Sequence, residues 1–159
     1  MSKENKTNAM RFLEAHRIAY RPHLYQCDEF IDGVSVARLA GQPCAQTFKT
    51  LVAHGKPHCF YVFAIPVDRE LDFKKAARAV GEKSVELLPV KEINAVTGYI
   101  RGGCTVIGMK KQFPTTFHRS ALDFETIFLS GGRLGVQIEV SPQAVAAAID
   151  ARFEDILMG

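Results

Sequence analysis

Residues 47–65 read TFKTLVAHGKPHCFYVFAI. Two runs rich in β-forming residues, 47–53 and 58–65, flank the segment His54-Gly55-Lys56-Pro57, whose composition is typical of a turn. The pattern predicts an antiparallel hairpin. Because most side chains of both runs are apolar, we expect this hairpin to lie at the centre of a β-sheet.

A single lysine interrupts the first run. By the two-residue period of a strand, Lys49 shares one face with Leu51 and Ala53, which are both apolar. In one interpretation, Lys49 lies at an edge, where its aliphatic stem packs and its ammonium group reaches solvent. In the other, it is a cation at the floor of a pocket, facing a phosphate or a developing oxyanion.

Helical and strand patterns continue on both sides of the hairpin. Ser35, Asp72 and Ser141 are candidate helix caps. Helices are predicted over residues 7–16, 35–39, 73–80, 89–96 and 142–149. Further β-rich runs are residues 20–25, 85–88, 115–118, 126–130, 135–140 and 153–157. The turn Gly131-Gly132-Arg133 predicts a second hairpin.

The order of these segments indicates the fold class. Strands and helices do not alternate as regular βαβ units, so we expect an α+β fold of about six or seven strands with flanking helices, not a doubly wound sheet. With 159 residues and 47% hydrophobic composition, the chain can bury one substantial core. We therefore predict a single domain spanning residues 1–159.

Composition excludes several classes of protein. The longest apolar run, residues 59–67, is far shorter than the roughly 20 residues of a membrane-spanning helix, and the polar N-terminus does not resemble a secretory signal. The four cysteines (Cys27, Cys44, Cys59 and Cys104) form no Cys-x-x-Cys pair, so we expect free thiols in a reducing cytoplasm. A net charge of +3 permits a tRNA partner without arguing for one.

Few other segments carry a chemical signal. The glycine-rich residues 99–108 could bring backbone N–H groups close to a carbonyl or phosphate, or could form an ordinary turn; they do not match a P-loop. His54, His58 and Cys59 lack a second ligand pair, so no metal site is expected. The sequence offers no evident protein nucleophile.

Five motifs follow one another along the chain: Phe48-Lys49-Thr50-Leu51, Leu71-Asp72-Phe73-Lys74-Lys75-Ala76-Ala77, Thr97-Gly98-Tyr99-Ile100-Arg101-Gly102-Gly103, Gly108-Met109-Lys110-Lys111 and Ser130-Gly131-Gly132-Arg133. In this order and spacing they resemble the YbaK family, whose members are free-standing relatives of the editing domain of bacterial prolyl-tRNA synthetases. The similarity runs from about Ala9 to Ile156. The resemblance implies a mixed, barrel-like sheet with flanking helices.

The resemblance also implies roles for residues. The family's key lysine, needed for deacylation, falls on Lys49, which favours the pocket interpretation. The predicted substrate-binding residues are Tyr25, Phe30, Thr47, Thr50, Gly102, Gly103 and Ser130; among them Phe30 is the loosest match, because the preceding loop varies in length between relatives. Two departures stand out: Thr105-Val106 replaces a Ser-Pro of many relatives, and Gln137 replaces an acidic residue of some.

The activity implied is trans-editing, the removal of cysteine from mischarged tRNA(Pro), with the substrate's own thiol attacking its ester carbonyl. Alternatives are water-mediated removal of alanine or serine, and a non-catalytic module that binds tRNA or a synthetase. Phosphate contacts are predicted for Lys74, Lys75, Lys110 and Lys111. We expect prolyl-tRNA synthetase as a transient partner, a cytoplasmic location, and no cofactor, metal, membrane or DNA.

Overall fold

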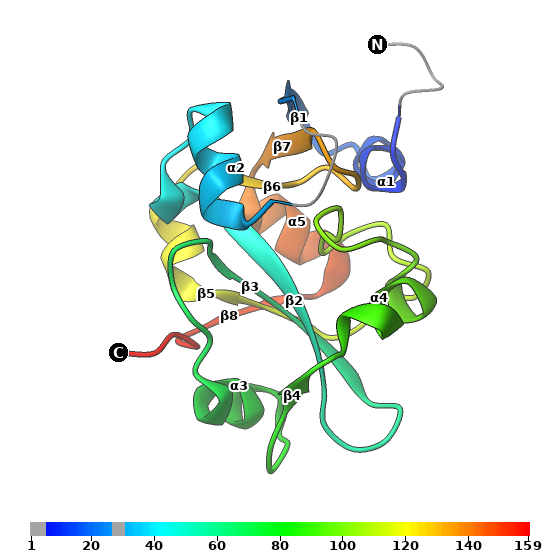
Figure 1. The fold of residues 1–159 in the computed structure, drawn as a ribbon, viewed down its shortest axis with the longest axis vertical. Coiled ribbons are helices and arrows are strands. Elements are labelled where there is room, and N and C mark those ends of the chain that lie inside the picture. The colour runs from blue at the N-terminus through cyan, green and yellow to red at the C-terminus, as the bar shows by residue number, and fades with distance from the viewer. Residues whose placement is uncertain (1–5, 27–30) are drawn as a thin grey trace.

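The computed structural model describes residues 6–26 and 31–159, and the predicted hairpin runs through its centre (Figure 1). Strand β2 (Phe48–His54) pairs antiparallel with β3 (Phe60–Pro66) over its whole length. Both belong to a five-stranded sheet of order β4-β2-β3-β5-β8. The remaining strands of this sheet are β4 (Glu86–Leu87), β5 (Thr115–His118) and β8 (Arg152–Glu154). The central position predicted for the hairpin is confirmed.

A second sheet has three strands in the order β1-β7-β6. They are β1 (Tyr20–Leu24), β6 (Ile127–Ser130) and β7 (Val136–Val140), all antiparallel. The second predicted hairpin, β6–β7, is confirmed. One parallel bridge, between Thr47 and Phe128, links the two sheets just before β2 begins.

The predicted α+β class is confirmed, with eight strands in the described residues instead of six or seven. These strands form two linked sheets and do not close into a barrel, so the barrel-like detail stays a prediction. None of the helices in the described ranges is long and apolar enough to cross a membrane. The helices are α1 (Asn8–Ala15), α2 (Gly33–Ala40), α3 (Phe73–Val80), α4 (Val90–Thr97) and α5 (Pro142–Ile149), with 3-10 turns at Cys44–Gln46 and Arg119–Asp123.

The helix caps follow the sequence closely, with one correction. Asp72 and Ser141 cap α3 and α5 as predicted, each through its side-chain oxygen. Helix α2, however, is capped by Asp32, whose carboxylate accepts a hydrogen bond of 2.8 Å from the Ser35 N–H. Both residue types cap well, and local sequence did not distinguish them. The helix therefore starts two residues earlier than predicted.

The five-stranded sheet is buried on both faces. Along β3, Val62 and Ala64 point into a core shared with the second sheet, α1 and α5, while Phe63 and Ile65 point into a core against α3. Burying an aromatic side chain such as Phe63 contributes about 1.5–3 kcal/mol. Because both faces are filled, a solvent-filled site on this sheet has to open at a strand edge.

Candidate functional site

Strand β2 has such an open edge. One side is paired with β3, but the other meets β4 only at Ala53 and His54 and the second sheet only at Thr47. In the described part of the chain, no strand pairs with this edge between those two contacts. The sheet therefore has a gap along the middle of β2.

Hydrogen bonds show which backbone groups face the gap. Val67 donates its N–H to the Thr47 carbonyl at 2.9 Å, and Leu88 donates its N–H to the Val52 carbonyl at 2.8 Å. Backbone groups of a strand point alternately to its two sides. Thr47 thus faces β3 and Val52 faces away from it, so the N–H and C=O groups of Thr50 point into the gap.

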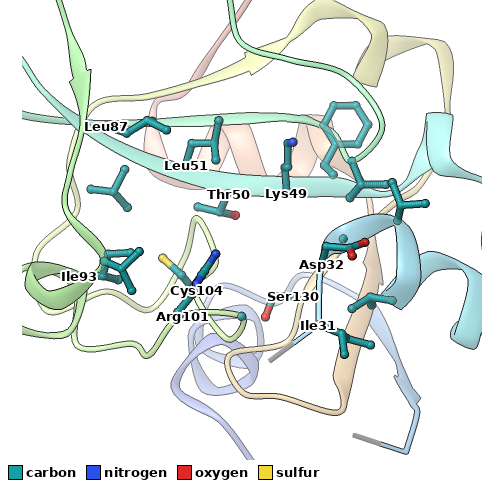
Figure 2. Close-up of a pocket in the computed structure, with 18 of the residues that line it drawn as sticks. Ile31, Asp32, Lys49, Thr50, Leu51, Leu87, Ile93, Arg101, Cys104 and Ser130 are labelled. Atoms are coloured by element: carbon teal, nitrogen blue, oxygen red, sulfur yellow. The ribbon is translucent and has the colours of Figure 1, made fainter. Parts of the chain in front are cut away.

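A cavity of about 500 Å³ opens along this edge (Figure 2). Figure 2 shows β2 with Lys49, Thr50 and Leu51 on one side of the cavity and Arg101, Cys104 and Ser130 on the other. The remaining walls come from the start of α2, from the segment linking β4 to α4, and from β7. Side chains there include Ile31, Asp32, Val36, Leu87, Leu88, Val90, Ile93 and Gln137.

Four of the predicted site residues meet in this cavity. Lys49 and Thr50 come from β2, Gly102 from the glycine-rich loop at residues 99–108, and Ser130 from the end of β6. Gly102 has a φ of 85°, a left-handed conformation that favours glycine. The loop lies outside regular helices and strands, as predicted.

Three other predicted residues lie elsewhere. Thr47 is buried, and its hydroxyl donates to the Pro43 carbonyl at 2.8 Å. Gly103 does not line the cavity, and its N–H donates to the Ile100 carbonyl at 3.0 Å. Tyr25 lines a separate, shallow depression beside residues 133–136. Phe30 lies outside the described residues.

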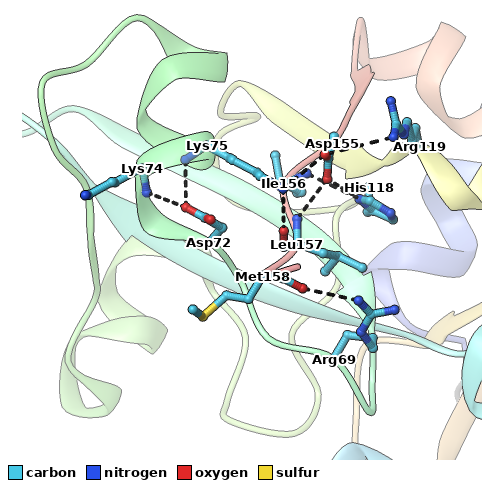
Figure 3. A network of polar contacts seen from close by, with 10 residues as sticks. All are labelled: Arg69, Asp72, Lys74, Lys75, His118, Arg119, Asp155, Ile156, Leu157 and Met158. Atoms are coloured by element: carbon cyan, nitrogen blue, oxygen red, sulfur yellow. Dashed lines mark hydrogen bonds and ion pairs between the residues drawn. The ribbon is translucent and has the colours of Figure 1, made fainter.

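The four predicted phosphate-binding lysines divide into two groups. Lys75 donates to the Asp155 carboxylate at 3.1 Å and to the Leu157 carbonyl at 2.9 Å (Figure 3), and Lys110 donates to the Ala95 carbonyl at 3.3 Å. Lys74, Lys110 and Lys111 are exposed, and Lys75 is half-buried. Lys74 and Lys75 lie on α3, whereas Lys110 and Lys111 follow the glycine-rich loop, so the two pairs are distant in sequence.

Sequence reasoning did not assign several polar or charged cavity residues to the site, namely Asp32, Arg101, Cys104 and Gln137. Gln137 was recognised only as a departure from the family, yet it lines the cavity beside Ser130, its partner across the β6–β7 pair. Cys104 was treated only as a scattered thiol. The signal available in the sequence was the predicted β6–β7 hairpin, because its register places residues 130 and 137 opposite each other on one face of the sheet.

The charges in the cavity are mostly positive. Lys49 and Arg101 are cations, and among the described residues that line the cavity Asp32 is the only carboxylate. Hydrogen bonds from Ser35 lower the pKa of Asp32 and hold it ionised. Burial raises the pKa of the Cys104 thiol to about 11, so Cys104 is protonated at neutral pH. The cavity can bind an anion and hydrogen-bond a ligand, but the lining residues that the structure describes supply no activated nucleophile.

Metal chemistry has no evident site here. Within residues 6–26 and 31–159, no three histidine, cysteine or acidic side chains gather as a possible metal site. His54 instead lies 3.9 Å from the Glu86 carboxylate. The described residues of this cavity offer hydrogen bonds and charge.

Comparisons with known proteins agree with this geometry. A family model described as the aminoacyl-tRNA editing domain matches residues 32–148, which include every residue of the cavity except Ile31. EbsC of Enterococcus faecalis, to which Cys-tRNA(Pro)/Cys-tRNA(Cys) deacylase activity is attributed, is 43% identical over 154 residues, covering 96% of this chain and 94% of that protein.

Solved structures share the fold at lower identity. A crystal structure of the hypothetical protein APE2540 has a TM-score of 0.86 and 22% identity, covering 95% of this chain and 99% of that one. A crystal structure described as a trans-editing enzyme for prolyl-tRNA synthetase has a TM-score of 0.81 and 22% identity, covering 100% of this chain and 99% of that one.

Proposed function

The chain belongs to the aminoacyl-tRNA editing domain family, and we propose that it is a free-standing hydrolase that removes cysteine from mischarged tRNA(Pro). The observation that carries this proposal is the cavity on the open edge of β2. It gathers Lys49, Thr50, Gly102 and Ser130 while supplying no activated nucleophile. A site of this kind suits a substrate that brings its own nucleophile.

The cavity has the size of a small-molecule site, since such pockets usually measure about 300–1,000 Å³. We propose that the 3′-terminal nucleotide and its esterified amino acid enter it together. Lys49 then contacts the nucleotide as a cation, and the exposed Arg101 lies at the same cavity. Phosphate contacts of this kind position the acceptor end without reading base sequence.

The chemistry follows from the bound geometry. The cysteine thiol attacks its own ester carbonyl, a sulfur–carbon bond forms, and the carbon–oxygen bond to the ribose breaks. The thiol proton passes to the departing ribose oxygen, and water then opens the resulting thiolactone. Holding the thiol against its carbonyl can supply up to about 7–11 kcal/mol of barrier reduction. In this mechanism the protein positions the reacting atoms and does not attack.

Gly102 is proposed to stabilise the carbonyl oxygen. Its main chain reaches the cavity without a side chain in the way. Loss of one well-placed hydrogen bond to such an oxygen lowers a rate by about 100- to 1,000-fold. Gly103 is not assigned this role, because its N–H is already bonded to Ile100.

The deciding experiment compares hydrolysis of tRNA(Pro) charged with cysteine, S-methylcysteine, alanine or serine. We expect rapid release of cysteine and little release of S-methylcysteine, which lacks a free thiol. Equal release of cysteine and S-methylcysteine would exclude attack by the substrate and favour water. Binding of all four esters with no release would instead identify a non-catalytic tRNA-binding module.

Phosphate contacts alone do not select one tRNA. We therefore propose that prolyl-tRNA synthetase, as a transient partner, supplies tRNA identity, and that the protein acts in the cytoplasm where tRNA is charged. Adding that synthetase to the same assay should raise the rate on tRNA(Pro) more than the rate on a second tRNA carrying cysteine.

A further inference from the structure

Two buried polar atoms on the cavity wall have no hydrogen-bond partner in the described structure. They are Oγ1 of Thr50 and Oε1 of Gln137. The Gln137 side chain is only 6% exposed, so solvent does not compensate for the missing bond. An unpaired buried acceptor costs about 1–3 kcal/mol in general, which makes a bound ligand the natural partner.

The topology places Thr50 and Gln137 across the cavity from each other, at the end nearest the bridge between the two sheets. The bridge between Thr47 and Phe128 joins the starts of β2 and β6, which run on in parallel. Thr50 lies three residues after the bridge on one strand, and Ser130 lies two residues after it on the other. Gln137 is the cross-strand partner of Ser130. In Figure 2, Thr50 and Ser130 occupy opposite sides of the cavity.

The unpaired groups share one chemical property. All of them can accept hydrogen bonds: the amide oxygen of Gln137 only accepts, the Thr50 hydroxyl accepts as well as donates, and the backbone carbonyl of Thr50 faces the gap together with its N–H. Among the parts of an aminoacyl ester, the carbonyl and the phosphates are acceptors. The α-ammonium group is purely a donor, with three N–H bonds, and is therefore the part that complements these atoms.

We propose that Gln137 and Thr50 form a neutral subsite that binds the α-ammonium group of the esterified amino acid. This inference rests on the proposed function and adds the residues that recognise the amino end of the substrate. Asp32, the only carboxylate that lines the cavity within residues 6–26 and 31–159, is engaged with Ser35 at the start of α2. Recognition at this subsite therefore depends on hydrogen-bond acceptors of the protein and not on a buried opposite charge.

The test replaces the ammonium group without changing its size. Cys-tRNA(Pro) is compared with the tRNA ester of the matching α-hydroxy acid, in which a hydroxyl stands in place of the ammonium. Each enzymatic kcat/KM is divided by the uncatalysed hydrolysis rate of the same ester. We expect wild-type protein to prefer the amino ester by about 10- to 100-fold, the range of hydrogen bonds to a charged group.

Variants of Gln137 then locate the preference. Gln137→Met keeps the length of the side chain and removes the acceptor, so the preference should fall by about 10-fold or more, whereas Gln137→Glu should keep it. Thr50→Val should reduce it partially, because the backbone carbonyl of Thr50 remains. The folded state of each variant is checked by thermal unfolding, and removal of an unpaired polar group should not destabilise it.

The chain contains matched controls. The amide of Gln42 is buried, 8% exposed and also without a partner, and the buried hydroxyl of Thr105 is likewise unpaired, yet neither residue lines the cavity. Gln42→Met and Thr105→Val should therefore leave the preference unchanged.

Two results would overturn the subsite while leaving the proposed function intact. One is a wild-type protein that hydrolyses both esters equally well after correction. The other is a Gln137→Met protein that loses both activities in the same proportion, which would indicate a structural or water-binding role for Gln137. Absence of hydrolysis of either ester by wild-type protein would instead overturn the proposed function, and this subsite with it.

Discussion

A β-carbon added to Gly103 would stand 2.8 Å from the Arg133 Cα, closer than such atoms approach in proteins. The glycine-rich loop at residues 99–108 and the turn between β6 and β7 are therefore in direct backbone contact. Both carry residues of the cavity, Gly102 from the loop and Ser130 just before the turn. Their spacing depends on the absence of a side chain at position 103.

Substitution of this glycine should disturb both segments. Gly103→Ala is expected to lower the free energy of unfolding by about 1–3 kcal/mol through overpacking and to reduce deacylation as the loop shifts. Gly81→Ala is the control, because Gly81 ends α3 with a φ of 76° and open space around it, and no residue of α3 lines the cavity. That variant should lose stability but keep activity. Unchanged activity in Gly103→Ala would show that the loop position is not critical.

Lys49 is the residue on which the proposed function depends most. Lys49→Ala should lower the rate of deacylation by at least about 100-fold and leave thermal stability nearly unchanged. The reason is that a cation lining a cavity stabilises a bound anionic ligand and contributes little to the packing of the fold. Lys56→Ala, in the exposed turn of the same hairpin, is the matched control. Wild-type turnover by a folded Lys49→Ala protein would remove Lys49 from the site.

Cys104 should be unreactive although it lines the cavity. With the pKa of its thiol raised to about 11 by burial, about one molecule in a thousand carries the thiolate at pH 8. Iodoacetamide labelling, followed by mass spectrometry, should therefore be far slower at Cys104 than in the denatured protein. Cys104→Ser and a chelator should both leave deacylation intact. Loss of activity in either case would reopen a thiol or metal mechanism.

Stability should fall as the pH drops below about 6.5. His118 is buried, and its Nδ1 accepts a hydrogen bond of 3.3 Å from the Ile156 N–H. Burial lowers the pKa of His118 below its usual value, so the unfolded chain binds more protons at mildly acidic pH. The stabilisation is complete above about pH 6.5 and is lost as pH falls towards the folded-state pKa.

The measurement is the free energy of unfolding between pH 5 and 7, by urea titration. Replacing His118 with Gln should flatten this dependence, whereas His16→Gln, on the exposed end of α1, should not. The carboxylates Asp155 and Glu139 also have lowered pKa values, but they titrate at more acidic pH and do not contribute to the change in stability between pH 5 and 7. If the free energy of unfolding of His118→Gln depends on pH as strongly as that of the wild type, another group causes the loss of stability.

The four basic residues proposed as phosphate contacts should not behave alike. Lys74→Ala and Lys111→Ala should each reduce the slope of log kcat/KM against log salt by about 0.7–0.9, as expected for one lost phosphate contact. Lys75→Ala should mainly lower stability, because its ammonium group holds Asp155 and the Leu157 carbonyl near the C-terminus (Figure 3). Equal salt slopes in all three variants would refute this division.

Sequence reasoning succeeded where the pattern is local. The hairpin at 47–65, the caps Asp72 and Ser141, and the β6–β7 turn follow from neighbouring residues, and each is present. Lys49 was singled out because it is the one charged residue in the run 47–53. The structure places it in the cavity, but its role there stays a prediction.

What local sequence could not supply were contacts between distant segments. The bridge from Thr47 to Phe128 sets β2 beside β6 at the cavity, and it leaves no signal in the spacing of nearby residues. Lys75 was taken for a free cation because its partner, Asp155, lies 80 residues away. Gly102 and Gly103 were assigned one role, although packing against Arg133 separates them.

The open edge of β2 also bears on solubility. An unpaired strand edge is a template on which a second chain can add a strand, and proteins must protect such edges from aggregation. Here the exposed backbone of Thr50 lies inside a cavity flanked by the start of α2 and by α4. The elements that admit the substrate thus also keep another polypeptide out, so loosening either helix would endanger the protein's solubility as well as its selectivity.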